Sequence, residues 1–238
     1  MKRRAGLPAL IIANGDIPPA GVVRALARTV RGRSGLIVCA DGGSRHAVSL
    51  RIRPTVILGD LDSLPRGIRR SLPSSPIVLD TDQESTDLEK AIRHCIAAGC
   101  SSADIVGATG GRIDHTAGAL GCLRRFGGKI ALRLIDRSGE LRLLLNSERI
   151  RVTRGEAFSL IPLGRCRGIV LRGARYPLSG ESLEAGVREG ISNRTTGRVL
   201  IVRHASGPLL LYRFDPGPGS RAGRAPGGEG KKRGRARR

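Results

Sequence analysis

Aromatic residues are scarce in this 238-residue chain: Phe, Trp and Tyr together make up 2% of it, and tryptophan is absent. The hydrophobic residues, 39% of the chain, are therefore mostly aliphatic, and we expect Leu, Ile, Val and Ala to fill the core. Aromatic platforms on which single-stranded nucleic acids stack are lacking. A chain of this length can bury a sizeable core as one large domain or two small ones.

Cysteine is also sparse, and its five positions are scattered and never in Cys-x-x-Cys spacing. This pattern argues against a disulfide framework and a zinc site, and it favours a reducing compartment. No apolar run reaches the length of a membrane-spanning helix, and the run after Met1-Lys2-Arg3-Arg4 is too short for a signal peptide. We therefore expect a cytoplasmic protein in which most of the cysteines are small buried hydrophobes.

Acidic residues are few: 20 Asp and Glu stand against 42 Lys and Arg, which gives a formal net charge of +22. Such a charge favours nucleic acid or anionic surfaces as partners. The charge is uneven, because residues 216–238 hold eight basic residues and one acidic residue, whereas residues 41–114 hold nine basic and ten acidic ones. The central segment is thus nearly neutral in a basic chain.

The first half alternates short apolar runs with amphipathic stretches. The apolar runs predict buried strands, the amphipathic stretches predict helices, and their alternation indicates an α/β fold with a mostly parallel sheet flanked by helices. Strands are expected at 7–13, 36–40, 55–58, 76–79 and 103–106, and helices at 20–30, 44–50, 65–72, 86–98 and 115–126.

The second half changes character from about Lys129. Its apolar runs are short, often alternating, and separated by Gly, Pro, Asn and Ser, which is typical of an antiparallel β-sandwich or small barrel. These runs lie at 130–135, 140–145, 157–161, 168–171, 198–203 and 209–214. We therefore predict an α/β domain over residues 1–137, a β-sandwich domain over 138–214 and a disordered basic tail over 215–238.

Aspartates gather where the predicted strands end. Eight of the 11 aspartates fall between residues 41 and 114. Ligands of parallel sheets bind at the carboxyl ends of the strands. Carboxylates suit a hard metal ion, and glycines allow close approach of backbone to phosphate. The sequence therefore predicts an enzyme acting on a nucleotide, with its site built from Asp41, Asp60, Asp62, Asp82, Asp87 and the segment 110–114.

Two of these segments have both a functional and a structural interpretation. In Gly59-Asp60-Leu61-Asp62-Ser63 the carboxylates at i and i+2 lie on the same side of an extended chain, where Mg²⁺ bridging to phosphate would relieve their repulsion. The alternative is a solvated turn that caps the next helix. Asp41-Gly42-Gly43 is either a simple turn or a contact to a metal ion or to ribose hydroxyls.

The other two segments precede helices. Thr86 and Glu89 have capping-box spacing, and Lys90 is placed either to neutralise phosphate or to form a surface ion pair with Asp87. The segment 107–115 is a glycine-rich turn whose N–H groups and following helix favour an anion, with Arg112 as a bidentate phosphate ligand. It matches neither the dinucleotide fingerprint nor the P-loop.

Several motifs of this chain resemble those of thiamine pyrophosphokinases, and they occur in the same order. The resemblance covers about residues 10–214 and extends to two C-terminal segments. The motifs are Asp41-Gly-Gly, Gly59-Asp-Leu-Asp-Ser63, Asp82-Gln-x-x-Thr-Asp87-x-x-Lys90 and Gly110-Gly-Arg-x-Asp-His115, followed by Gly173-Ala-Arg-Tyr176-Pro-Leu and Ile191-Ser192-Asn193.

The resemblance implies a catalytic α/β domain that binds ATP and Mg²⁺, a thiamine-binding β-sandwich, and a homodimer whose site combines both subunits. The implied reaction transfers diphosphate from ATP to thiamine, giving thiamine diphosphate and AMP. Ala119 departs from the Asn that the family often has, and Arg194 follows Asn193 in place of a more apolar continuation.

The resemblance also implies a role for individual residues. Metal ligands would be Asp60, Asp62 and Asp41. Catalytic residues would be Asp60, Asp62, Asp87, Lys90, Arg112 and Asp114. The nucleotide would contact Asp41, Gly42, Asp82, Gln83, Thr86, Gly110, Gly111 and His115. Thiamine would contact Tyr176, Ser192 and Asn193.

Two other functions remain open at this point. A related diphosphokinase could use the same catalytic half on another alcohol, such as a hydroxymethylpterin, although Tyr176 and Asn193 favour thiamine. A nucleic-acid-binding protein would explain the net charge, but the chain has no aromatic platform and no recognised binding module.

Overall fold

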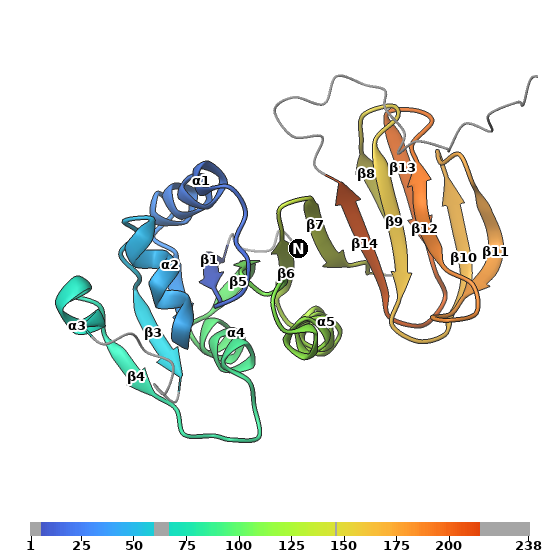
Figure 1. Cartoon of the computed structure of the whole chain (residues 1–238). Coiled ribbons are helices and arrows are strands. Elements are labelled where there is room, and N and C mark those ends of the chain that lie inside the picture. Colours follow the sequence, from blue (N-terminus) through green and yellow to red (C-terminus); the bar gives the residue numbers. More distant parts are fainter. Residues whose placement is uncertain (1–5, 60–66, 146, 215–238) are drawn as a thin grey trace, which may run out of the picture.

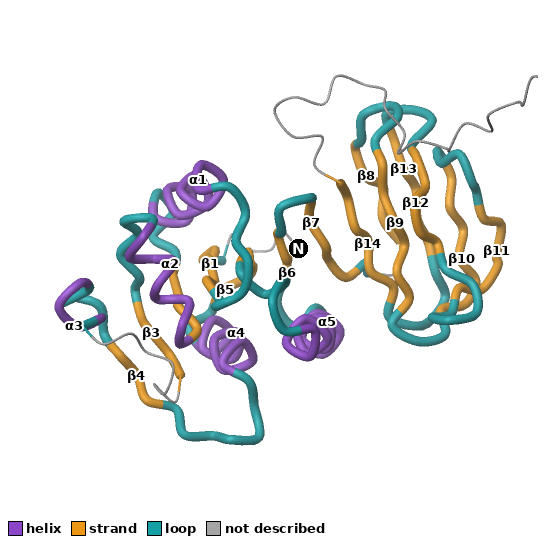
Figure 2. Tube along the Cα trace, in the orientation of Figure 1, coloured by secondary structure: helices purple, strands orange, loops and turns teal. Residues whose placement is uncertain are grey.

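The computed structural model describes residues 6–59, 67–145 and 147–214. These residues form a ten-stranded sheet with helices packed on it, and a separate four-stranded sheet lies beside one end of it (Figures 1 and 2). Within this part of the chain, no helix has both the length and the apolar character needed to cross a membrane. The predicted fold class, a mostly parallel sheet flanked by helices plus an antiparallel sandwich, is confirmed.

The parallel part of the large sheet has the order β6-β5-β1-β2-β3-β4. Its strands are β1 (Leu7–Ile12), β2 (Leu36–Ala40), β3 (Val56–Gly59), β4 (Ile77–Leu79), β5 (Cys100–Val106) and β6 (Ala131–Ile135). The intervening helices are α1 (Ala20–Arg31), η1 (Asp41–Gly43), α2 (Ser44–Ser49), α3 (Ile68–Ser71), α4 (Asp87–Ala97) and α5 (Ile113–Phe126).

Both faces of the parallel sheet are buried at its central strands β1, β2 and β3, which explains their continuous apolar runs. Leu10 and Ile12 of β1 face α1 and α2, and Ile11 faces the core formed with α4 and α5. Successive residues of one strand point to opposite faces, so an unbroken apolar run is needed wherever both faces are covered. The five cysteines are buried in these cores or in the sandwich, as predicted.

The pairing of β6 differs from the one expected from the sequence. The run 130–135 was expected to belong to the antiparallel part of the chain, but β6 pairs in parallel with β5, with Ile105 opposite Leu134. Its alternating burial arises because α5 covers only one of its faces. The long α5 crossover returns the chain in the direction that parallel pairing requires.

The large sheet continues past β6 through antiparallel strands in the order β7-β14-β9-β12. These strands are β7 (Gly139–Leu143), β14 (Leu209–Phe214), β9 (Ala157–Pro162) and β12 (Gly190–Arg194). Hydrogen bonding therefore runs unbroken across the predicted boundary at 137/138, and the division into domains stays a prediction. The predicted tail 215–238 lies outside the described residues.

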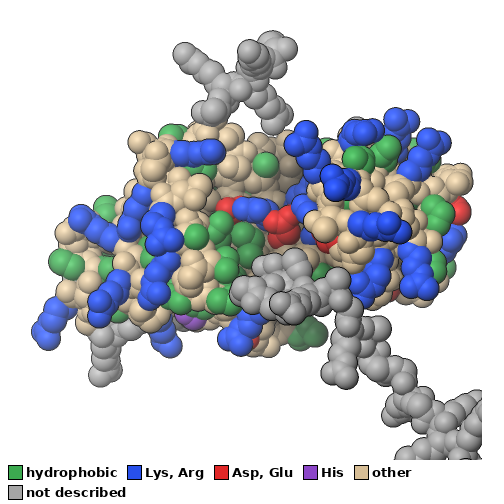
Figure 3. All heavy atoms as spheres, turned by 90° about the horizontal axis from the view of Figure 1, so that it is seen from above, with side chains coloured by type: hydrophobic (Ala, Val, Ile, Leu, Met, Phe, Trp, Pro, Cys, Tyr) green, Lys and Arg blue, Asp and Glu red, His purple; other side chains and the backbone are tan. Residues whose placement is uncertain are grey.

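A chain of ion pairs crosses the junction between the parallel and antiparallel parts. Arg133 of β6 donates to Asp104 of β5 at 2.9 Å and to Glu140 of β7 at 2.8 Å. Arg213 of β14 lies 3.5 Å from Glu140 and donates to Glu156 at 2.7 Å. Acidic neighbours, Asp104 first, raise the pKa of Arg133. In the view from above, most visible acidic side chains lie near the hollow between the two lobes (Figure 3).

The four-stranded sheet has the order β11-β10-β13-β8 and packs against the antiparallel end of the large sheet. The shared core contains Phe158 and Leu160 of β9 and Leu200 and Val202 of β13. The strands are β8 (Ser147–Arg151), β10 (Cys166–Arg172), β11 (Leu178–Leu183) and β13 (Val199–Arg203). The apolar runs did not mark β8, β11 or β12, since each of these strands carries mostly polar residues and only one or two buried ones.

Candidate active site

A cavity of about 380 Å³ lies at the carboxyl edge of the parallel sheet. Loops that follow β1, β2, β4 and β5 supply its walls. It is lined by Ala13, Asn14, Gly15, Ala40, Asp41, Gly42, Asp82, Gln83, Ser85, Thr86, Asp87, Leu88, Lys90, Gly107, Ala108, Gly110, Gly111, Arg112, His115 and Ala119.

The strand order explains why the cavity forms at this point. β1 lies between β2 and β5, so the chain leaves β1 toward one side of the sheet and later returns on the other side. The loops diverge at such a switch point and leave a crevice at the strand ends, where ligands of open α/β sheets bind. The sequence pattern of aspartates at strand ends predicted this edge.

Asp41 lies immediately after β2 with only 4% of its surface exposed. Its φ of 37° is in the left-handed region, which a non-glycine residue adopts only at some cost in free energy. A Cβ placed on Gly59 would lie 2.7 Å from the Asp41 Cβ and 3.2 Å from Asp87 Oδ1. The two carboxylate side chains therefore approach each other at the end of β3, where only a glycine leaves room for both.

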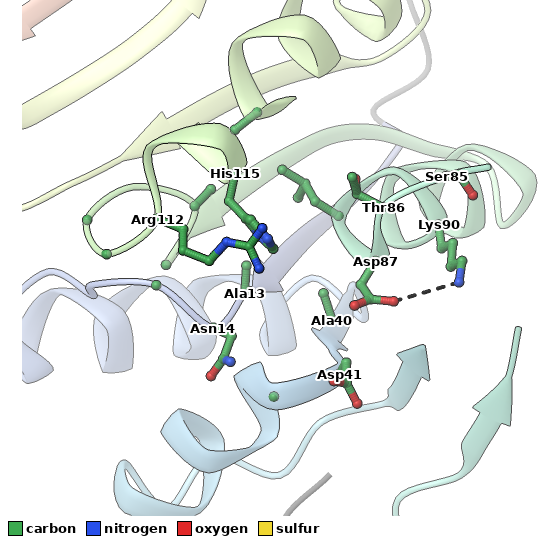
Figure 4. A pocket seen from close by; sticks show the side chains of 18 of the residues that line it. Ala13, Asn14, Ala40, Asp41, Ser85, Thr86, Asp87, Lys90, Arg112 and His115 are labelled. Carbon is green, nitrogen blue, oxygen red and sulfur yellow. Dashed lines mark ion pairs between the residues drawn. The ribbon is translucent and has the colours of Figure 1, made fainter. Parts of the chain in front are cut away.

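The start of α4 places a cation beside the cavity. Thr86 is the N-cap and accepts a hydrogen bond from the Glu89 N–H, as the capping pattern predicted. One helical turn later, Lys90 is 4% exposed; its Nζ donates to the Asp80 carbonyl at 2.8 Å and lies 3.8 Å from Asp87 Oδ1 (Figure 4). A buried ammonium with few partners is suited to neutralising a bound anion.

Asp82 shapes the loop that leads into α4. Its carboxylate accepts hydrogen bonds from the Ser85 hydroxyl at 2.6 Å and from the Glu84 N–H at 2.9 Å. These contacts, the one from Ser85 first, lower the pKa of Asp82. The side chain lines the cavity, and its hydrogen bonds fix the shape of one wall.

The turn after β5 presents glycine backbone and two basic side chains. Gly110 and Gly111 both have φ of 74°, a conformation that favours glycine and here precedes α5. In Figure 4, Arg112 and His115 lie together on one side of the cavity, with Asp87 and Lys90 on the other. The N–H groups of such a turn and the positive end of the helix dipole favour a phosphate.

Asp114 pairs with Arg112 and does not line the cavity. Arg112 Nε donates to Asp114 Oδ1 at 3.1 Å, and a second guanidinium nitrogen donates to Oδ2. This pairing, helped by the His115 N–H, lowers the pKa of Asp114 to about 2. A carboxylate with so low a pKa is a weak proton acceptor, so the geometry favours Asp114 as the residue that orients Arg112.

Eleven of the predicted site residues come together in the cavity: Asp41, Gly42, Asp82, Gln83, Thr86, Asp87, Lys90, Gly110, Gly111, Arg112 and His115. Asp60 and Asp62 lie outside the described residues. The described residues contain no group of three or more His, Cys, Asp or Glu that could hold a metal ion. The carboxylate oxygens of Asp41 and Asp87, which approach each other, are of the type that Mg²⁺ prefers.

The three residues predicted on the thiamine side lie in the sandwich and do not line this cavity. Asn193 is 5% exposed; its Oδ1 accepts from the Tyr176 N–H at 3.1 Å and its Nδ2 donates to the Tyr176 carbonyl at 2.8 Å. Ser192 has φ of 61°, and its N–H donates to Ser159 Oγ. Asn193 thus fixes the backbone of Tyr176, whose side chain is 59% exposed.

Sequence reasoning missed several lining residues. Most are Ala or Gly, whose types carry no chemical signal, but Asn14 is polar and follows β1 just as Asp41 follows β2. The rule that ligands bind at strand ends applies equally to β1 and would have found Asn14. The other missed residues are Ala13, Gly15, Ala40, Ser85, Leu88, Gly107 and Ala108.

Family comparisons match the chain in two parts. Residues 28–134 match the model described as thiamin pyrophosphokinase, catalytic domain, and residues 147–206 match thiamin pyrophosphokinase, vitamin B1 binding domain. A rice protein named thiamine pyrophosphokinase 1 is 30% identical over 190 residues, which cover 68% of this chain and 72% of the rice protein. The chain belongs to the thiamine pyrophosphokinase family.

Further relatives agree with this assignment. The Bacillus subtilis thiamine pyrophosphokinase is 27% identical over 186 residues, covering 75% of this chain and 86% of that protein. A solved B. subtilis structure of the same name covers 87% of this chain and 98% of its own, with a TM-score of 0.75 at 24% identity. The Candida albicans structure has a TM-score of 0.77 at 20% identity and covers 87% and 89% of the two chains. At these identities the solved structures show the shared fold, and the family consists of ATP-dependent thiamine diphosphotransferases.

The pKa of Asp114 tests the pairing with Arg112. Because the pKa is lowered, the carboxylate stays charged down to about pH 2, and the pairing is lost as the pH falls through that value. Arg112→Gln should raise the pKa of Asp114 toward about 3.9, its ordinary value. Carboxyl ¹³C NMR titration measures this, with the exposed Arg137→Gln as the control. An unchanged pKa in Arg112→Gln would show that Arg112 is not the cause.

Proposed function

We propose that this chain transfers the terminal diphosphate of ATP to the hydroxyl group of thiamine, yielding thiamine diphosphate and AMP. The observation that carries the proposal is the cavity at the carboxyl edge of the sheet. A buried Lys90, an Arg112 at a glycine turn and the carboxylates of Asp41 and Asp87 surround it. The matched catalytic and vitamin B1 binding domains support ATP and thiamine as the two substrates.

The phosphates of ATP bind to the turn that precedes α5 and to the side chains of Lys90 and Arg112. The backbone N–H groups of Gly110 and Gly111 hold phosphate oxygens, and Arg112 adds a bidentate contact. Lys90 approaches from the opposite side and offsets negative charge on the transferred group. This arrangement aligns the β-phosphorus for attack, and alignment with charge neutralisation supplies most of the catalysis in such transfers.

The bond changes are simple. The thiamine hydroxyl oxygen forms a bond to the β-phosphorus, and the bond from that phosphorus to the oxygen shared with the α-phosphate breaks. AMP leaves with that oxygen, and the hydroxyl proton passes to a carboxylate that lines the cavity. Asp87 is supported over Asp114 in this role, because Arg112 holds the Asp114 pKa near 2.

Magnesium is part of the proposal. Asp41, together with Asp60 and Asp62 beyond the end of β3, would hold the ion. The close approach of Asp41 and Asp87 around Gly59 brings two carboxylates to this wall of the cavity, and carboxylate oxygens are the ligands that Mg²⁺ prefers. When bound, Mg²⁺ would screen the charge of the triphosphate. In the sequence, Asp41 directly follows β2, and Asp60 and Asp62 come directly after β3.

We further propose a homodimer in which a second copy completes the site. Tyr176, Ser192 and Asn193 lie in the sandwich and not at the cavity of the same chain. Large apolar side chains are exposed on both parts: Ile113 beside the cavity is 85% exposed, and Val187 and Ile191 in the sandwich are 79% and 57% exposed. Removing such side chains from water at an interface between two copies would be favourable. Pairing two copies would cover them and bring thiamine ligands to the nucleotide.

The proposed setting is the cytoplasm. All five cysteines are buried free thiols, which is the usual state in reducing compartments. Burial raises the pKa of Cys39 and of Cys95 to about 12, so both remain protonated and unreactive at neutral pH.

Product analysis tests the reaction. The full chain incubated with ATP, Mg²⁺ and thiamine should produce equal amounts of AMP and thiamine diphosphate, measured by chromatography. Lys90→Met keeps the shape of the buried side chain but removes its charge, and kcat/KM should fall by about 10²-fold. ADP as the nucleotide product would contradict diphosphate transfer. A hydroxymethylpterin used in preference to thiamine would contradict the assigned acceptor.

Mixed dimers test the shared site. Lys90→Met damages the cavity, and Tyr176→Ala damages the exposed thiamine side, so each variant alone should be nearly inactive. Co-refolding equal amounts makes about half of the dimers mixed, and each mixed dimer has one intact site, so about a quarter of wild-type activity should return. Complete absence of recovery would place both residues in the site of a single subunit.

A further inference from the structure

Asn14 presents an unused amide to the cavity. It follows β1 at the switch point of the sheet, its side chain is exposed, and it lines the cavity. The amide has no hydrogen-bond partner among the residues that the structure describes. It therefore has both a donor and an acceptor available to a ligand.

The loop that carries Asn14 is fixed by three hydrogen bonds to two neighbouring segments. The Gly15 N–H donates to the Gly107 carbonyl at 2.6 Å, and the Asp16 N–H donates to the Thr109 carbonyl at 2.8 Å. From the other side, His46 Nε2 donates to the Gly15 carbonyl at 2.9 Å. The backbone of Asn14 is thus held between the turn after β5 and helix α2, so little ordering is required when a ligand binds.

Gly42 supports the amide itself. A Cβ placed on Gly42 would lie 2.5 Å from both Cγ and Nδ2 of Asn14 and 2.8 Å from its Oδ1. All three amide atoms therefore rest on the bare α-carbon of Gly42. The φ of Gly42 is not in the left-handed region, so its backbone does not require glycine. The close approach of Asn14 is the reason that a side chain is excluded here.

The electrostatic setting favours a neutral donor at this position. In Figure 4, Asn14 lies below Arg112 and His115 and to the left of Asp41. An aspartate in place of Asn14 would add a second anion near Asp41 and would repel phosphate. An amide N–H can bind an oxygen of the ligand without adding negative charge near Asp41 and without repelling phosphate.

We propose that Asn14 Nδ2 donates a hydrogen bond to a phosphate or ribose oxygen of the bound nucleotide, and that Gly42 positions the amide for this contact. The inference rests on the proposed function, because it takes the cavity to be the nucleotide site. Asn14 contacts the substrate, whereas Gly42 and His46 act through the Asn14 loop as positioning residues.

ATP binding to the full chain, measured by calorimetry with Mg²⁺ and without thiamine, tests the contact. Asn14→Ala should weaken ATP binding about tenfold, the size of one hydrogen bond. Asn14→Asp should weaken it further, because the donor is replaced by a negative charge. In turnover assays the loss in Asn14→Ala should appear mainly in KM for ATP. Binding of ATP by either variant within twofold of wild type would overturn the inference.

A double-mutant cycle tests the role of Gly42. Gly42→Ala should weaken ATP binding to a similar extent, because the new Cβ displaces the amide. The double variant should bind ATP as tightly as Asn14→Ala alone does, because no amide remains for the new Cβ at position 42 to displace. Gly21→Ala is the matched control, because a Cβ there meets no atom within 4 Å and Gly21 lies in α1, away from the cavity. Independent, multiplying losses would overturn the assignment of Gly42 as support for Asn14.

Two further ligands distinguish the oxygen that is bound. If it belongs to phosphate, Asn14→Ala should also weaken binding of inorganic triphosphate. If it belongs to a ribose hydroxyl, Asn14→Ala should bind triphosphate as tightly as wild type does. The ATP analogue that lacks that hydroxyl, either the 2′- or the 3′-deoxy form, should then bind wild type and Asn14→Ala equally. Wild-type protein that binds neither ATP nor triphosphate would overturn the proposed function and this inference together, whereas normal ATP binding by Asn14→Ala would overturn only the inference.

Discussion

The parallel pairing of β1 with β2 on one side and β5 on the other is the constraint on which the site depends. Register is fixed by pairs such as Ile11 with Val38 and Ile11 with Ile105. Because these strands run in one direction, the segments that follow them leave from one edge and must diverge there. Asn14, Asp41 and the Gly110–Gly111 turn, remote in sequence, become walls of one cavity as a result.

Much of this was accessible from the sequence, because burial on both faces leaves a strong pattern. The apolar runs located β1 to β5 to within a few residues, and the aspartates at strand ends located the edge at which the cavity lies. The capping arrangement at Thr86 located the start of α4 and hence the turn of helix that carries Lys90. These predictions held because local sequence and global topology favour the same arrangement.

Other features depend on tertiary contacts that leave no local pattern. Strands β8, β11 and β12 are largely polar and have few buried residues, so only their pairing partners define them. The Arg112–Asp114 pairing, which makes Asp114 a poor base, became visible only with side chains in place. The separation of Tyr176 and Asn193 from the cavity likewise follows from the packing of the sandwich, and it is the observation on which the proposed dimer rests.

Hydrogen exchange measured by mass spectrometry, with and without ATP and Mg²⁺, tests most directly the claim that the nucleotide binds at the carboxyl edge of the parallel sheet. The account predicts slower exchange in the segments 13–16, 41–43, 82–90 and 107–115, which line or adjoin the cavity. Exchange in the outer sheet of β8, β10, β11 and β13 should be unchanged by ATP alone. Protection confined to that sheet, with no change at the ends of β1, β2 and β5, would contradict the account.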